Sequence, residues 1–217
     1  MYMVGHEKRQ FEVSLIWVLI NFIGITTGTL VAFFLYTALA DRYDGVALDQ
    51  AKLLLRLAAC GAAQGFIVSG LQTVVLLLSQ GELLLWLCTN VCGMALGMAA
   101  PTLWAIAASP EFEIAFPFGR YVVAGWLLSW MLSGLLGGWV LGKTRSQQLR
   151  WSLLSAGAYL YWGLATGLGM KLLQEILRET AAIRWSSSLL WIGLMLAIGA
   201  WLHSYVFREI ARTRFKA

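Results

Sequence analysis

Residues 57–100 read LAACGAAQGFIVSGLQTVVLLLSQGELLLWLCTNVCGMALGMAA, and this run contains a single charged side chain, Glu82. A helix that crosses a bilayer needs about 20 mostly apolar residues, so the run is long enough for two crossings. The polar residues around Glu82 divide it near its middle. We therefore predict two transmembrane helices, over residues 53–79 and 83–108.

Charge-poor runs of similar length occur on both sides of this pair. They predict four more crossings, at residues 14–39, 121–142, 151–170 and 186–207. The chain of 217 residues is 59% hydrophobic and 12% charged, with a mean hydropathy of +0.72, which is outside the range of soluble domains. We expect an all-α integral membrane bundle of six transmembrane helices that forms a single domain, residues 1–217.

The charged residues predict an orientation for this bundle. With an even number of crossings, both termini lie on the same side of the membrane. Nine Lys and Arg residues fall on that side against four acidic residues, whereas the other side carries seven of each. Because loops rich in Lys and Arg are retained in the cytoplasm, we predict cytoplasmic N- and C-termini. This distribution explains the net charge of +5 without a nucleic-acid partner.

Glycine pairs four residues apart recur in five of the six predicted helices. Such pairs leave a groove in which another backbone can approach closely, which is how helices associate when lipid removes the hydrophobic drive. The grooves fit a compact bundle within one chain, and a seam between two chains is the alternative. The pairs are Gly24 with Gly28, Gly61 with Gly65, Gly93 with Gly97, Gly134 with Gly138, Gly138 with Gly142, and Gly163 with Gly167.

Tryptophan residues repeat together with these glycines. Trp17 precedes Gly24 at the same spacing as Trp86 precedes Gly93, with an offset of 69 residues between the two patterns. Trp151 and the glycines of the fifth predicted helix continue the pattern with altered spacing. A unit that recurs at this interval predicts three consecutive helical hairpins of about 70 residues each.

The segment Gly61–Gly65, followed by Gln72 and by Trp86 with its two spaced glycines, resembles the hairpin repeat of uncharacterised multi-pass membrane proteins common in cyanobacteria. That repeat reads G-x-x-x-G, then Q-W-x-V-L, a short turn, and W with spaced glycines. Thr73 stands where the first Trp of the repeat is usual. The resemblance implies a bacterial host and a plasma or thylakoid membrane, and it implies no established activity.

The polar side chains inside the predicted helices are mainly amides and hydroxyls. Acids and lysines inside a membrane usually mark proton or ion pathways, and the predicted spans lack them near their midplanes. Arg56, about a turn inside its span, is expected to extend its guanidinium to the interface. Gln64 and Gln72 share one helical face and can meet Asn90 across the hairpin. They form either interhelical hydrogen bonds or a polar pocket for a small ligand.

His203 is the only histidine inside a predicted span. Its imidazole can ligate the metal of a haem or a chlorophyll, so haem, chlorophyll and carotenoid stay open as cofactors, and a hydrogen bond to a carbonyl or a headgroup is the alternative. Cys88 and Cys92 have no further ligands near in sequence, so we expect no metal site. The sequence patterns of rhomboid proteases and CDP-alcohol phosphotransferases are incomplete, so we expect no enzyme and assign no catalytic residue.

The predicted outer loop at residues 110–119 carries an apolar stripe at every second position. In an extended loop these side chains share one face. The stripe either covers the loop's own bundle and membrane interface or docks onto another protein. Its members are Phe112, Ile114, Phe116 and Phe118.

These features predict a non-catalytic multi-pass membrane subunit that packs into, or helps assemble, a larger membrane protein complex. Its partners are then the lipid bilayer and other membrane protein subunits, with a photosynthetic complex as the candidate that the resemblance suggests. The alternative is a small-molecule carrier such as the substrate-binding component of an energy-coupling-factor transporter. That class has six helices and a similar length, and it predicts a pocket around Gln64, Gln72 and Asn90.

The orientation can be tested with a cysteine added after Ala217, in a variant whose native cysteines are replaced by serine. The added cysteine should react with a membrane-impermeant maleimide only after the cells are permeabilised, because the tail is predicted to be cytoplasmic. A Ser109→Cys variant, in the predicted outer loop, should react in intact cells. Labelling of the tail from outside would contradict the predicted orientation.

Overall fold

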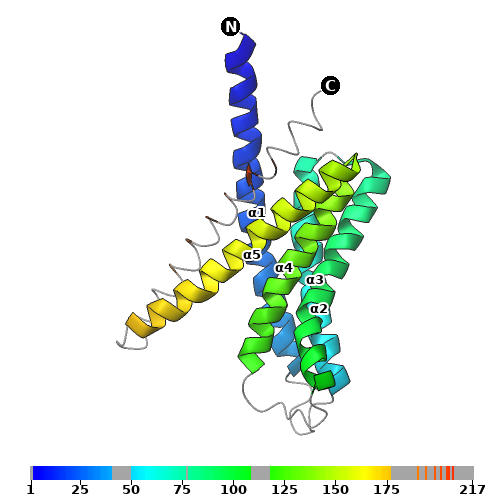
Figure 1. The fold of residues 1–217 in the computed structure, drawn as a ribbon, viewed down its shortest axis with the longest axis vertical. Helices are drawn as coiled ribbons and strands as arrows, with labels where there is room; N and C mark the ends of the chain where they lie inside the picture. The colour runs from blue at the N-terminus through cyan, green and yellow to red at the C-terminus, as the bar shows by residue number, and fades with distance from the viewer. Residues whose placement is uncertain are drawn as a thin grey trace.

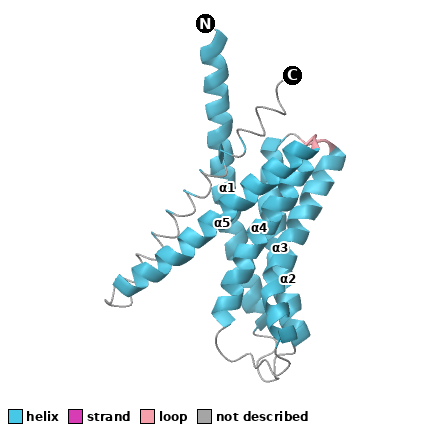
Figure 2. Ribbon diagram, in the orientation of Figure 1, coloured by secondary structure: helices cyan, strands magenta, loops and turns pink. Residues whose placement is uncertain are grey.

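The computed structural model describes a helical protein, and within the described residues it contains only helices and short turns (Figure 2). The described backbone covers residues 2–40, 50–76, 78–108 and 118–176, together with positions 190, 194, 198, 201, 204, 205 and 207. The helices are α1 (Tyr2–Ala40), α2 (Gln50–Leu76), α3 (Gln80–Ala108), α4 (Phe118–Leu141) and α5 (Arg145–Ile176).

Four of these helices are long and apolar enough to cross a membrane. They comprise α2, α3, residues Leu15–Leu39 of α1 and residues Ala124–Leu141 of α4. The prediction of an all-α chain with several helices of this kind is confirmed. The fifth predicted span, 151–170, lies within α5, and most of the sixth, 186–207, lies outside the described residues. The total of six crossings, the three hairpins and the orientation of the termini therefore stay predictions.

Each helix packs against the next one in the sequence, from α1 on α2 through to α4 on α5. Figure 1 shows α2, α3 and α4 side by side, α1 extending past them at its N-terminal end, and α5 crossing them obliquely. Large apolar side chains cover the outside of the bundle, such as Leu55, Val74 and Trp104, each at least 70% exposed. Such an apolar exterior is what lipid contact requires.

Hydrogen-bonded caps set the two short turns. Before α3, the backbone N–H and the hydroxyl of Ser79 donate to the carboxylate of Glu82 at 3.0 and 2.9 Å. Before α5, the N–H of Gln147 donates to Thr144 Oγ1 at 3.3 Å, and Lys143 N–H donates to Gln147 Oε1 at 3.1 Å. These are capping boxes or close relatives of them. The Ser79 and Glu82 cap explains why α3 begins three residues earlier than predicted, and α2 also ends three residues earlier.

The predicted glycine grooves lie where helix backbones meet. A Cβ added at Gly65 of α2 would lie 2.8 Å from the Asn90 carbonyl oxygen of α3, and one at Gly61 would overlap the Met94 carbonyl oxygen. Only glycine therefore permits this approach. Similar close approaches occur for Gly93 against Ser133, Gly97 against Ser129, Gly134 against Ser155 and Gly138 against Ser152.

The remaining predicted glycines differ. Gly24 and Gly28 of α1 face α2 at ordinary to slightly tight distances, with the nearest atoms 3.4 and 3.1 Å from an added Cβ. Gly142 lies in the turn after α4, and an added Cβ there would lie 2.5 Å from the backbone nitrogen of Gln148 of α5, so it also permits a close approach. Gly163 and Gly167 lie in α5, and their surroundings are outside the described residues.

Substitution of alanine for Gly61 should test the groove between α2 and α3. We expect Gly61→Ala to lower the stability in detergent by about 1–3 kcal/mol, because the new methyl overlaps a backbone carbonyl. Gly70→Ala is the matched control in the same helix, since nothing lies within 4 Å of its added Cβ. The measurement is reversible unfolding of both variants, and equal losses would contradict the close packing.

Candidate functional site

Buried large side chains from every described helix meet at one end of the bundle. We call this set the aromatic cluster, and each member is at most 4% exposed. The rings of Trp17 and Phe207 stack within it, with centroids 4.2 Å apart and planes 8° apart. It therefore holds together parts of the chain from α1 to position 207. Its members are Trp17, Leu76, Trp86, Leu141, Trp151 and Phe207.

The first two tryptophans of the cluster carry the same polar arrangement. Asn21 follows Trp17 by four residues, as Asn90 follows Trp86, and both asparagines are buried. In each pair the asparagine Nδ2 donates to the tryptophan carbonyl oxygen at 2.8 Å. The spacing seen in the sequence thus corresponds to a repeated hydrogen bond, which leaves each Oδ1 directed at the neighbouring helix.

Those two oxygens join neighbouring helices. Gln72 of α2 donates from Nε2 to Asn21 Oδ1 of α1 at 2.7 Å, and the Ser133 hydroxyl of α4 donates to Asn90 Oδ1 of α3. Ser155 of α5 stands four residues after Trp151, where the other two helices have asparagine, and it is 4% exposed. Its side chain is shorter than a carboxamide, so it reaches less far across the bundle.

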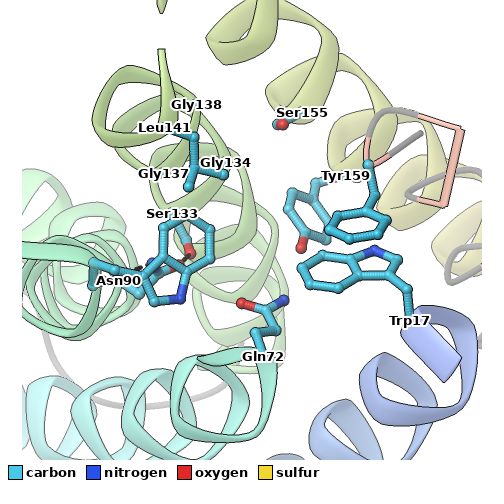
Figure 3. Close-up of a pocket in the computed structure, with 12 residues that line it drawn as sticks. Trp17, Gln72, Asn90, Ser133, Gly134, Gly137, Gly138, Leu141, Ser155 and Tyr159 are labelled. Carbon is cyan, nitrogen blue, oxygen red and sulfur yellow. Dashed lines mark hydrogen bonds between the residues drawn. The ribbon is translucent and has the colours of Figure 1, made fainter. Parts of the chain in front are cut away.

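Gln72 and Asn90, which the sequence placed together, line one small cavity inside the aromatic cluster (Figure 3). The centre of a water molecule can occupy a volume of about 10 Å³ within it, which leaves room for one water molecule. Gly137 of α4 is part of the wall, and a Cβ there would lie 2.8 Å from the Trp86 ring. Other wall residues are Trp17, Ser133, Gly134, Gly138, Leu141, Ser155, Tyr159 and Phe207.

Two polar atoms at this cavity are buried and have no hydrogen-bond partner among the described residues. They are Gln72 Oε1 and Trp86 Nε1, one an acceptor and the other a donor. Figure 3 shows the Gln72 carboxamide between Asn90 and Tyr159, and the Tyr159 hydroxyl lies beside that carboxamide. Leaving such a group unsatisfied costs about 1–3 kcal/mol each, so the pair needs an explanation.

Gln64 does not join this site as predicted. It is 1% exposed, and its Nε2 donates to Thr29 Oγ1 of α1 at 2.9 Å. An added Cβ at Gly28 would lie 3.1 Å from Gln64 Cγ, so the two helices are close at this level. The shared pocket of Gln64, Gln72 and Asn90 is therefore corrected to a cavity with two of them, and Gln64 joins α2 to α1 elsewhere.

Serine side chains of α4 and α5 were missed by the sequence analysis. The Ser129 hydroxyl lies 2.9 Å from the Met94 carbonyl oxygen of α3 and 2.8 Å from that of Gly125. Ser152 of α5 donates to the Leu135 carbonyl oxygen of α4 at 2.6 Å. The available signal was a stripe of small residues at every fourth position of α4, in which two serines stand between two glycines, namely Gly125, Ser129, Ser133 and Gly137.

Arg56 differs from its prediction as well. It was expected to extend to the interface, but its side chain is only 4% exposed. Its neighbours Leu53 and Leu57 belong to a buried cluster with Met98 of α3 and with Tyr36 of α1 packed against it. Because α1 and α3 cover this part of α2, the guanidinium stays inside the protein, where it interacts electrostatically with Tyr36.

Several predicted residues lie outside the described residues, and their roles stay predictions. They are the pigment or haem ligand His203 and the docking residues Phe112, Ile114 and Phe116. Phe118 begins α4, but its side chain is not described. Within the described part of the chain, no three His, Cys, Asp or Glu side chains come together to hold a metal ion.

No family model, curated protein or solved structure matches the chain. The fold and the site by themselves define a helical protein with at least four helices of membrane-spanning length and apolarity. Within it, buried amides and hydroxyls join neighbouring helices at the level of the aromatic cluster.

The bond between Gln72 and Asn21 can be tested with a double-mutant cycle. We expect Asn21→Leu alone to cost about 1–2 kcal/mol of stability, because it removes the Asn21 acceptor from the buried Gln72 amide. Asn21→Leu with Gln72→Leu should cost less than the two single losses together, with a coupling of about 0.6 kcal/mol. Thr73→Val is the control, since the Thr73 hydroxyl bonds only within its own helix, to the Gly70 carbonyl. Strictly additive losses would argue against the bond.

Proposed function

We propose that this protein is a non-catalytic multi-pass membrane subunit that packs into, or helps assemble, a larger membrane protein complex. The observation that carries the proposal is how the interior of the bundle is filled. Glycines bring helix backbones into contact, and the buried amides and hydroxyls hydrogen-bond between helices. The cavity at the aromatic cluster has space for about one water molecule, which is too small for a substrate.

Such an interior favours a rigid body. Close packing resists local rearrangement, and the interhelical bonds fix the rotation of α1 to α4 about their axes. A rigid bundle can present a fixed outer surface to a neighbouring subunit without a conformational cost on binding. These properties suit a scaffold or assembly role better than a carrier that alternates between conformations.

The outer surface of α1 offers such a contact face. Phe33 and Phe34 form an edge-on pair with ring centroids 6.0 Å apart, and they are 61% and 64% exposed. Among the described helices α1 packs mainly on α2, so much of its circumference faces outward. Helices in lipid associate through shape and close contact, and aromatic side chains are enriched among residues that dominate binding.

The sequence resemblance supports the setting of this proposal. The α2–α3 hairpin resembles repeats of cyanobacterial multi-pass proteins, which favours a bacterial plasma or thylakoid membrane and a photosynthetic complex as the partner. Six transmembrane helices in three hairpins, with cytoplasmic termini, belong to the same proposal. The repeated Trp and Asn arrangement in α1 and α3 supports the first two hairpins.

A second candidate is the substrate-binding component of a transporter, because Gln72 and Asn90 do line a common cavity. Small-molecule sites usually have volumes of about 300–1,000 Å³, whereas the centre of a water molecule can occupy only about 10 Å³ of this cavity. Binding of a larger ligand would require α4 to move away from α3, or α5 to move away from α4, at the glycine and serine contacts. We therefore rank this candidate second.

Purification from the native membrane in mild detergent tests the proposal. We expect the protein to run in a larger complex on native gels, and Phe33→Ala with Phe34→Ala to lower the yield of co-purified partner about tenfold or more. Phe66→Ala is the control, since Phe66 is 62% exposed on another helix. A monomer that a small molecule stabilises against heat would instead support the carrier.

A further inference from the structure

The unpaired acceptor and donor at the cavity are both almost fully enclosed. Gln72 is 2% exposed and Trp86 is 4% exposed, and both line the cavity inside the aromatic cluster. Neither Gln72 Oε1 nor Trp86 Nε1 has a hydrogen-bond partner among the described residues. Buried polar groups of this kind nearly always have a partner, either in the protein or in an ordered water.

Local rotation does not remove the two unpaired atoms. The Gln72 Nε2 donates to Asn21 Oδ1 at 2.7 Å, so an amide flip would place two carbonyl-type oxygens against each other. The Trp86 ring lies against α4 at Gly137, where a Cβ would be 2.8 Å from the ring. The geometry of the neighbours therefore fixes the acceptor and the donor at the wall of the cavity.

The cavity restricts what can satisfy them. Its volume of about 10 Å³ for a water centre corresponds to one water molecule and excludes a ligand with several heavy atoms. A water molecule can donate to the glutamine oxygen and accept from the indole N–H at the same time. The hydroxyl groups of Ser133 and Tyr159 are also in the wall, and a buried water typically makes about three hydrogen bonds.

The departure of α5 from the repeated pattern explains why space exists here. In α1 and α3 an asparagine follows the cluster tryptophan by four residues and bonds to the next helix. In α5 this position is Ser155, which lines the cavity. A serine side chain is smaller than an asparagine side chain by most of a carboxamide group, so the volume that an asparagine would fill is left open.

We propose that the cavity binds a single water molecule that donates a hydrogen bond to Gln72 Oε1 and accepts one from Trp86 Nε1. This water links α2 to α3 inside the aromatic cluster, in addition to the direct bonds between helices. It is independent of the proposed function, because it concerns the isolated chain and needs no partner subunit.

Nuclear magnetic resonance of the full-length protein, labelled with ¹⁵N at the tryptophan indoles and reconstituted in lipid nanodiscs, tests this proposal. The Trp86 indole signal is assigned by its loss in Trp86→Phe. We expect a cross-peak between the Trp86 indole proton and a long-lived water molecule. In the rotating frame its sign should be that of dipolar transfer and not that of chemical exchange. Absence of this transfer in the folded wild-type protein would overturn the proposal.

Two variants make the test specific to the cavity. Gly137→Ala should reduce the transfer several-fold, because its methyl group would push the Trp86 ring into the cavity. Gly157→Ala is the matched control, since nothing lies within 4 Å of its added Cβ, and its transfer should equal that of the wild type. If both variants keep the full signal, the water is bound elsewhere and the proposal is wrong. If Gly137→Ala does not fold, the wild-type measurement still decides.

Discussion

The close approach of helix backbones at small residues is the contact on which the rest of this structure depends. Lipid chains are as apolar as leucine, so helices gain little from hiding apolar side chains from their surroundings and must associate by packing and hydrogen bonds. Gly65 meets the backbone of α3 at Asn90, and Gly97 meets α4 at Ser129. At larger separations, a side chain as short as that of Ser129 would not reach the Met94 carbonyl oxygen of α3.

The hydrogen bonds between helices fix the register of this packing. A glycine groove permits a range of rotations and shifts, whereas Asn21 can accept from Gln72 in one register only. The same is true of Asn90 and Ser133. The aromatic cluster then forms because α3 and α5 begin, and α2 and α4 end, at the end of the bundle that α1 passes at Trp17. Close packing and register together bring distant parts of the sequence to one site.

Much of this could be predicted because lipid restricts the choices. A long apolar run must be a helix, glycines four residues apart must share a face, and Gln72 and Asn90 lie in consecutive helices joined by a short turn. The burial of Arg56 and the bond from Gln64 to Thr29 could not, because they depend on how far each helix is rotated towards its neighbours. The serine bonds depend on separations that a sequence does not give. The end of α2 and the start of α3 lie three residues earlier than predicted, where Ser79 and Glu82 form the cap of α3.

The turn between Leu76 and Gln80 has a consequence for biosynthesis. A connection this short, closed by the Ser79 and Glu82 cap, holds the C-terminal end of α2 next to the N-terminal end of α3 as soon as both have left the ribosome. The Gly61 and Gly65 contacts with α3 are then local, and local contacts form quickly. The two helices are therefore suited to associate early as one hairpin, whose interior amides then bond to α1 and α4 when those helices pack against it.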